Sequence, residues 1–177
     1  CSGIFTAPVI PFHIDMPLPN VANTARALNL DESDIGFDGH KIAALQGGPR
    51  FFYVPVKTRS SLENSRVLEP HWSALIKPMN GVDAAYIYTR GGDGPNASFR
   101  ARMYAPTGGI PEDPATGSAT ALLAAQLLGA ESLDDGTHHW QLEQGYEMGR
   151  PSDLRLEADV KAAKLNAVRV GGSAIQL

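Results

Sequence analysis

The chain has 177 residues, of which 43% are hydrophobic and 19% charged, and its 15 Lys and Arg against 19 Asp and Glu give a net charge of −4. This composition is typical of a globular protein long enough to bury a core, and the acidic balance argues against a nucleic-acid-binding surface. No apolar run reaches the roughly 20 residues that span a bilayer, and a single cysteine, Cys1, excludes an internal disulfide. We therefore expect a cytoplasmic protein with no nucleic-acid and no membrane partner.

The first part of the chain predicts short strands and short helices. Asn20 is placed to cap a helix on which Val21, Ala25 and Leu28 share one face. Apolar spacing predicts a second helix around residues 68–76, with Pro70 in its first turn. Strands are expected at residues 4–9, 41–45 and 51–56.

The second part is rich in the period-two pattern of strands. Phe99, Ala101 and Met103 alternate with Arg100 and Arg102, which predicts a half-buried strand. Similar patterns predict strands at residues 84–89, 140–142, 154–156 and 168–170. Because strands and helices do not alternate regularly, we expect one α+β domain over residues 1–177 rather than a doubly wound sheet.

Residues 118–128 predict a helix that is apolar around nearly its whole circumference. Only Thr120 and Gln126 interrupt its run of Ala and Leu, and Gly129 is expected to end it. A helix with no polar face belongs inside a domain. We therefore expect a central helix wrapped by a sheet.

The start of this helix has the opposite character. The first N–H groups of a helix are unpaired and lie at the positive end of its dipole, so Thr116, Gly117, Ser118 and Ala119 form a candidate site for a carboxylate or phosphate. An acid, Asp113, directly precedes this turn and is a candidate for handling a proton. The same residues also fit an ordinary helix cap with Asp113 as a turn residue, and the pattern alone leaves both interpretations open.

Two separated motifs resemble those of the phenazine-biosynthesis PhzF-like proteins. The first is Gly109-Ile110-Pro111-Glu112-Asp113-Pro114-Ala115-Thr116-Gly117-Ser118-Ala119, and the second is Gln144-Gly145-Tyr146-Glu147-Met148-Gly149-Arg150-Pro151-Ser152. A closing run, Val168-Arg169-Val170-Gly171-Gly172-Ser173-Ala174, also fits. The resemblance is clear over residues 84–177 and looser over residues 1–83.

This resemblance implies a fold like diaminopimelate epimerase, in which two α+β halves each wrap a sheet around a central helix and the active site lies between them. It implies isomerisation by proton transfer without a metal or an organic cofactor. Asp113 would be the acid of the cleft, and Gly117 and Ser118 would hold a substrate carboxylate.

The family also carries a Glu acid/base on a strand and a Gly-His turn, and neither has a counterpart in this chain. Gly39-His40 is followed by Lys-Ile-Ala instead of a turn that opens a helix. We therefore expect this chain to be the C-terminal half of a longer protein, with its N-terminal half absent and negligible turnover by itself. The resemblance also implies a possible homodimer.

Two other functions compete with the isomerase. A racemase or epimerase of the two-base type would carry a cysteine near the start of the central helix, and residues 112–119 contain none. A non-catalytic module that binds a small anion or acts as a scaffold fits a chain that supplies only one wall of a site. His138-His139 lacks a third ligand at suitable spacing, so no metal site is expected.

Overall fold

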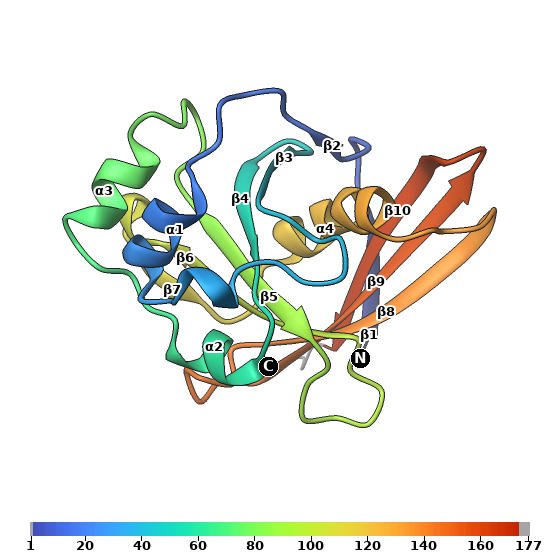
Figure 1. The fold of residues 1–177 in the computed structure, drawn as a ribbon. Coiled ribbons are helices and arrows are strands. Elements are labelled where there is room, and N and C mark those ends of the chain that lie inside the picture. Colours follow the sequence, from blue (N-terminus) through green and yellow to red (C-terminus); the bar gives the residue numbers. More distant parts are fainter. Residues whose placement is uncertain (1, 174–177) are drawn as a thin grey trace.

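A mixed sheet of ten strands dominates the computed structural model, which describes residues 2–173 (Figure 1). Cys1 and Ala174, which the sequence analysis used, lie outside the described residues. The strand order is β1-β10-β9-β8-β6-β5-β4-β3-β2, with β7 paired to β6 beside this path. The strands are β1 (Ser2–Thr6), β2 (Phe12–His13), β3 (Ala43–Gln46), β4 (Arg50–Pro55), β5 (Ala85–Arg90), β6 (Phe99–Ala105), β7 (Ile110–Asp113), β8 (Gly136–Gln144), β9 (Ser152–Lys161) and β10 (Lys164–Ser173).

The helices lie on both faces of this sheet. One face curls around α4, while the other face of β3, β4 and β5 packs against α1 and α3 (Figure 1). No helix within residues 2–173 is both long and apolar enough to cross a membrane. The helices are α1 (Val21–Leu28), α2 (Arg59–Asn64), α3 (His71–Ile76) and α4 (Gly117–Ala130), with short 3-10 helices η1 (Glu32–Asp34) and η2 (Pro106–Gly108).

The structure confirms one local prediction and corrects another. Asn20 caps α1, because its side chain accepts a hydrogen bond from the backbone N–H of Asn23 at 2.8 Å. The prediction of a half-buried β6 is wrong, since Arg100 and Arg102 are buried together with the apolar residues that alternate with them. In the same way Ile87 and Tyr88 on β5 are both fully buried, because packed elements cover both faces of the central strands.

Helix α4 is buried along almost its whole length. All residues from 119 to 127 are buried, including Thr120, whose hydroxyl donates to the Thr116 carbonyl, and Gln126, whose Nε2 donates to the Lys41 carbonyl at 2.7 Å. Gly129 does not end the helix as expected, because the helix continues to Ala130 and Glu131 is its C-cap. The two polar residues are therefore tolerated because each bonds a backbone carbonyl.

Tyrosines of the sheet hold the first turn of α4. The Tyr53 hydroxyl donates to the Ala119 carbonyl at 2.5 Å, and the Tyr86 hydroxyl lies 3.3 Å from Oγ1 of Thr120. Burial raises the pKa of both phenols well above its usual range, so both stay protonated throughout the physiological range. The start of α4 is thereby fixed to β4 and β5.

A buried histidine holds the other end of α4. His40 lies with Nδ1 at 2.8 Å from the Tyr88 hydroxyl and Nε2 at 3.2 Å from Oε1 of Glu131, the residue that ends the helix. A neutral ring that donates from Nε2 and accepts at Nδ1 satisfies both partners. Burial lowers the pKa of His40, an effect to which Arg90 adds and which Glu131 opposes.

We expect His40 to make stability fall on the acid side of neutrality. Because its folded-state pKa lies below the unfolded value of about 6.5, the stabilisation is fully present above that pH and is lost as the pH falls through the folded-state pKa. In His40→Gln, the free energy of unfolding measured in urea between pH 7 and pH 5 should depend less on pH than in the wild type. Equal slopes in the two proteins would contradict this account.

The buried face of α4 should dominate the stability of the sheet. Leu123 is fully buried among the strands, so Leu123→Ala should lower the free energy of unfolding by about 2–5 kcal/mol. Leu128 on the same helix is only partly buried, and Leu128→Ala is the matched control with a smaller expected loss. Urea titration measures the free energy of unfolding of both variants. Equal losses would show that the enclosed face of α4 contributes no more to stability than the partly exposed face.

Candidate functional site

The site forms where β8 ends and β7 ends along one edge of β6. Gln144, the last residue of β8, pairs with Ala101, and Asp113, the last residue of β7, pairs with Met103. Ala101 and Met103 are two positions apart on the same face of β6, the face that packs against α4. The ends of two strands far apart in sequence are therefore brought to the start of that helix.

Asp113, Thr116 and Gln144 form one hydrogen-bonded cluster at this point. The Thr116 hydroxyl donates to Oδ2 of Asp113 at 2.6 Å. The Gln144 amide accepts from the backbone N–H of Thr116 at 3.1 Å and donates to the Asp113 carbonyl at 2.7 Å and to Oγ1 of Thr116 at 2.9 Å. Thr116 and Gln144 are buried, and Asp113 is half-buried.

The first turn of α4 follows directly and is partly open to solvent. Thr116 is the N-cap but its side chain makes no capping bond, because that side chain is turned to Asp113. Within residues 2–173 the backbone N–H groups of Gly117, Ser118 and Ala119 make no hydrogen bond. Ser118 is exposed and Gly117 is half-buried, so this turn can offer donors to an anion. Asp113 does not cap the helix, and its carboxylate instead accepts the hydrogen bond from the Thr116 hydroxyl within the turn.

Glu112 lies on the opposite face of β7 and has a structural role. Its carboxylate receives two hydrogen bonds from Arg102, at 2.8 and 2.9 Å. Nη1 of Arg102 also donates to the carbonyls of Leu62, Glu63 and Ser65 at the end of α2. Burial tends to lower the pKa of Arg102, but the hydrogen bonds with Glu112 raise it overall. The two neighbouring acids thus separate, with only Asp113 turned to the helix start.

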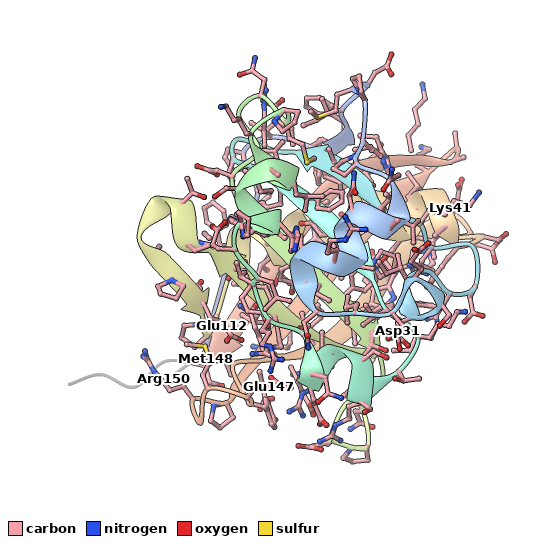
Figure 2. The ribbon with its side chains drawn as sticks, turned by 60° about the vertical axis from the view of Figure 1, so that its left-hand side comes forward. Asp31, Lys41, Glu112, Glu147, Met148 and Arg150 are labelled. Atoms are coloured by element: carbon pink, nitrogen blue, oxygen red, sulfur yellow. The ribbon has the colours of Figure 1, made fainter. Side chains whose placement is uncertain are left out.

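A network of ion pairs surrounds the buried Arg100 and was not predicted from the sequence. Arg100 donates to Asp93, Glu143 and Glu147, and its guanidinium lies 4.3 Å from the centre of the Tyr146 ring. Figure 2 shows Glu147 on the same side of the molecule as Glu112. The partners lie up to 47 residues from Arg100 in the sequence, so no local pattern predicts that they meet.

The loop of residues 145–150 packs against the Asp113-Pro114 segment. Gly145 has φ +79°, and a Cβ placed there would lie 2.3 Å from the Arg150 carbonyl oxygen and 2.8 Å from that of Pro114. The Arg150 side chain is exposed (Figure 2), and it makes no hydrogen bond within residues 2–173. The Gly145 backbone therefore lies directly beside the Pro114 carbonyl.

The candidate metal ligands do not converge. Nε2 of His138 lies 2.8 Å from the Asp134 carbonyl, and His139 lies beside Glu157. Within the described part of the chain, no three His, Cys, Asp or Glu side chains are grouped to hold a metal ion.

Comparison with known proteins identifies a family over nearly the whole chain. A sequence profile of the phenazine biosynthesis-like proteins (PhzC-PhzF) matches residues 5–177. An uncharacterized isomerase of Mesorhizobium japonicum is 35% identical over 153 residues, which are 85% of this chain and 51% of that protein. A trans-2,3-dihydro-3-hydroxyanthranilate isomerase of Pseudomonas fluorescens is 31% identical over 173 residues, 94% of this chain and 57% of that protein.

Solved structures give the same result for the fold. A phenazine biosynthesis protein of the PhzF family from Bacillus anthracis has a TM-score of 0.77 at 16% identity and covers 97% of this chain and 55% of that one. A predicted epimerase from Pseudomonas aeruginosa has a TM-score of 0.68 at 28% identity with the same coverage. The chain spans about half the length of the curated relatives it matches. The expectation that it is inactive by itself finds no support, because the profile runs over nearly the entire chain.

Gly145 should tolerate no side chain. Gly145→Ala should lower the free energy of unfolding by about 2–4 kcal/mol, since the added carbon meets two backbone oxygens that cannot rotate away. Gly149→Ala is the matched control, because Gly149 also has a positive φ but open space around its Cβ position. Its loss should be about 1 kcal/mol. Thermal or urea unfolding of the two variants measures the difference, and equal losses would contradict the close packing of the loop.

Proposed function

The chain belongs to the phenazine biosynthesis-like (PhzC-PhzF) family, and from this premise we propose that it supplies the carboxylate-binding wall of an isomerase that moves a proton within a small carboxylate-bearing metabolite. In this proposal α4 is the central helix of one half of a protein with a diaminopimelate epimerase-like fold. The relatives named as isomerases support the reaction class. The substrate class is proposed from the site.

One observation carries the proposal: an acid and a set of free donors lie side by side at the start of α4. Asp113 has Oδ2 held by Thr116, while Oδ1 accepts no hydrogen bond within residues 2–173. The unbonded N–H groups of residues 117–119 follow within one turn. A substrate carboxylate on these donors would place the adjoining carbon skeleton near Asp113.

The chemistry assigned to each group follows from its environment. The N–H groups of Gly117, Ser118 and Ala119, with the Ser118 hydroxyl as a further donor, bind and orient the substrate carboxylate. Asp113 takes a proton at Oδ1 from one substrate atom or delivers it to another, since Oδ2 is occupied. This scheme needs only side-chain and backbone groups of the protein, and a second acid/base group from outside this chain would complete it.

The wider context is part of the same proposal. The chain acts as one domain, binds a complementary N-terminal half, has the capacity to form a homodimer, and works in the cytoplasm. A non-catalytic anion-binding module remains the alternative, since the free donors at the start of α4 can bind an anion without any proton transfer. The racemase or epimerase alternative has no cysteine at residues 112–119 to support it.

The test is binding and proton exchange with trans-2,3-dihydro-3-hydroxyanthranilate. In ¹H-¹⁵N NMR titration, the amide signals of residues 113–120 should shift first. In deuterated solvent, the substrate should gain deuterium in the presence of this chain together with the complementary half that supplies the second acid/base group. Asp113→Asn should reduce that exchange by about 100-fold or more while leaving binding largely intact. Shifts confined to other residues would exclude the site. Binding without any exchange would favour the module.

Glu112→Gln is the matched control, because it changes the neighbouring acid in the same way. It leaves the buried Arg102 without its charged partner, so the free energy of unfolding should fall by about 2–4 kcal/mol. Exchange per folded molecule should change little. If instead Asp113→Asn lost stability and kept its exchange, Asp113 would be a structural residue only.

A further inference from the structure

We infer that Gln144 is the positioning residue of this site: it sets the direction of the Thr116 hydroxyl proton and thereby holds the Asp113 carboxylate in one orientation. The inference rests on the proposed function, since it concerns the acid proposed there. It gives the second sequence motif, Gln144-Gly145, a role that the reaction scheme does not otherwise use.

The partners of Gln144 allow only one orientation of its amide. A backbone N–H can only donate, so the atom that faces the Thr116 N–H must be the amide oxygen. A backbone carbonyl can only accept, so the atom that faces the Asp113 carbonyl must be the amide nitrogen. Gln144 is fully buried, and turning the amide over would oppose like groups at both contacts.

This orientation determines where the proton of Thr116 points. The second N–H of the Gln144 amide donates to Oγ1 of Thr116 at 2.9 Å, so that oxygen is an acceptor toward Gln144. Its single proton is then directed to Oδ2 of Asp113, 2.6 Å away. A hydrogen bond to a carboxylate is short and strong, and this one holds Oδ2 while leaving Oδ1 for the substrate.

The backbone contacts of the second motif support the same role. Gln144 bonds both the carbonyl of Asp113 and the N–H of Thr116, so it fixes both ends of the turn that joins β7 to α4. Gly145 lets the next residues approach the Pro114 carbonyl more closely than any side chain would permit. No other residue type of similar length offers both an amide donor pair and a strong acceptor, since an ionised Glu has no donor and Met has no donor and only a weakly accepting sulfur.

The first test measures the geometry itself. In Gln144→Met, the Thr116 amide should exchange with solvent at least about tenfold faster relative to the Thr120 amide, because its acceptor is gone. The ¹³C signal of the Asp113 side-chain carboxyl should move as well. Gln126→Met is the matched control, a second buried glutamine that bonds a backbone carbonyl but lies in the last third of α4. It should lower stability without changing this ratio or the Asp113 signal.

The second test separates positioning from simple stabilisation by a double-mutant cycle. We expect Gln144→Met and Thr116→Val each to lower kcat for deuterium exchange by about 10-fold or more, with a smaller change in KM, and Thr116→Ser to retain most of kcat. Because Gln144 acts through the Thr116 hydroxyl, the double variant should be little worse than Thr116→Val alone. The inference would be overturned if the effects of the two single variants on kcat multiplied in the double variant. A kcat of Thr116→Ser as low as that of Thr116→Val would overturn it as well.

The two tests also distinguish the inference from the proposed function. If the wild type catalyses no exchange of the substrate, the proposed function fails, and the Thr116 amide and Asp113 carboxyl signals alone decide whether Gln144 holds the acid. If those signals are the same in Gln144→Met and in the wild type, the inference fails whatever the activity.

Discussion

The burial of a helix without a polar face is the constraint on which this structure depends. Residues 119–127 of α4 must be removed from water on every side, and a single flat sheet covers only one side of a helix. The sheet therefore curls, so that strands from both of its ends, such as β10 and β3, contact the same helix (Figure 1). Only the two ends of α4 remain near the surface. His40 and Glu131 occupy one of them, and the candidate site occupies the other.

The sequence was a good guide wherever a pattern is local. The cap at Asn20 and the alternation along β6 depend on neighbours in the chain, and both led to the right type of element. The strand β7 was not predicted, because Gly and Pro at residues 106–111 indicate turns and because the segment becomes a strand only by pairing with β6. The burial of Arg102 escaped prediction for a similar reason: its partners are Glu112 and three carbonyls of α2, which only the fold brings together.

In the candidate site, too, the features set by neighbours in the sequence could be predicted and those set by the fold could not. The acid Asp113 and the helix start at Gly117 lie within one short motif, and their chemistry can be read from residue types. The separation of Glu112 from Asp113 could not be read in this way, since it follows from the alternation of a strand that the sequence did not predict. The part of Gln144 is visible only in three dimensions, where β8 ends beside β7, although its motif was noticed on the sequence.

Strands β7 and β8 pair with the same edge of β6, and this pairing limits where residues can be inserted or deleted. Because β8 pairs with residues 99–101 and β7 with residues 103–105, one residue inserted between Ala101 and Met103 would turn Asp113 and Gln144 to opposite faces of the sheet. The turn of residues 106–109 carries no such register, and all but one of its residues are exposed. Insertions and deletions in relatives are therefore compatible with an intact cluster when they fall in that turn, and incompatible with it when they fall between Ala101 and Met103.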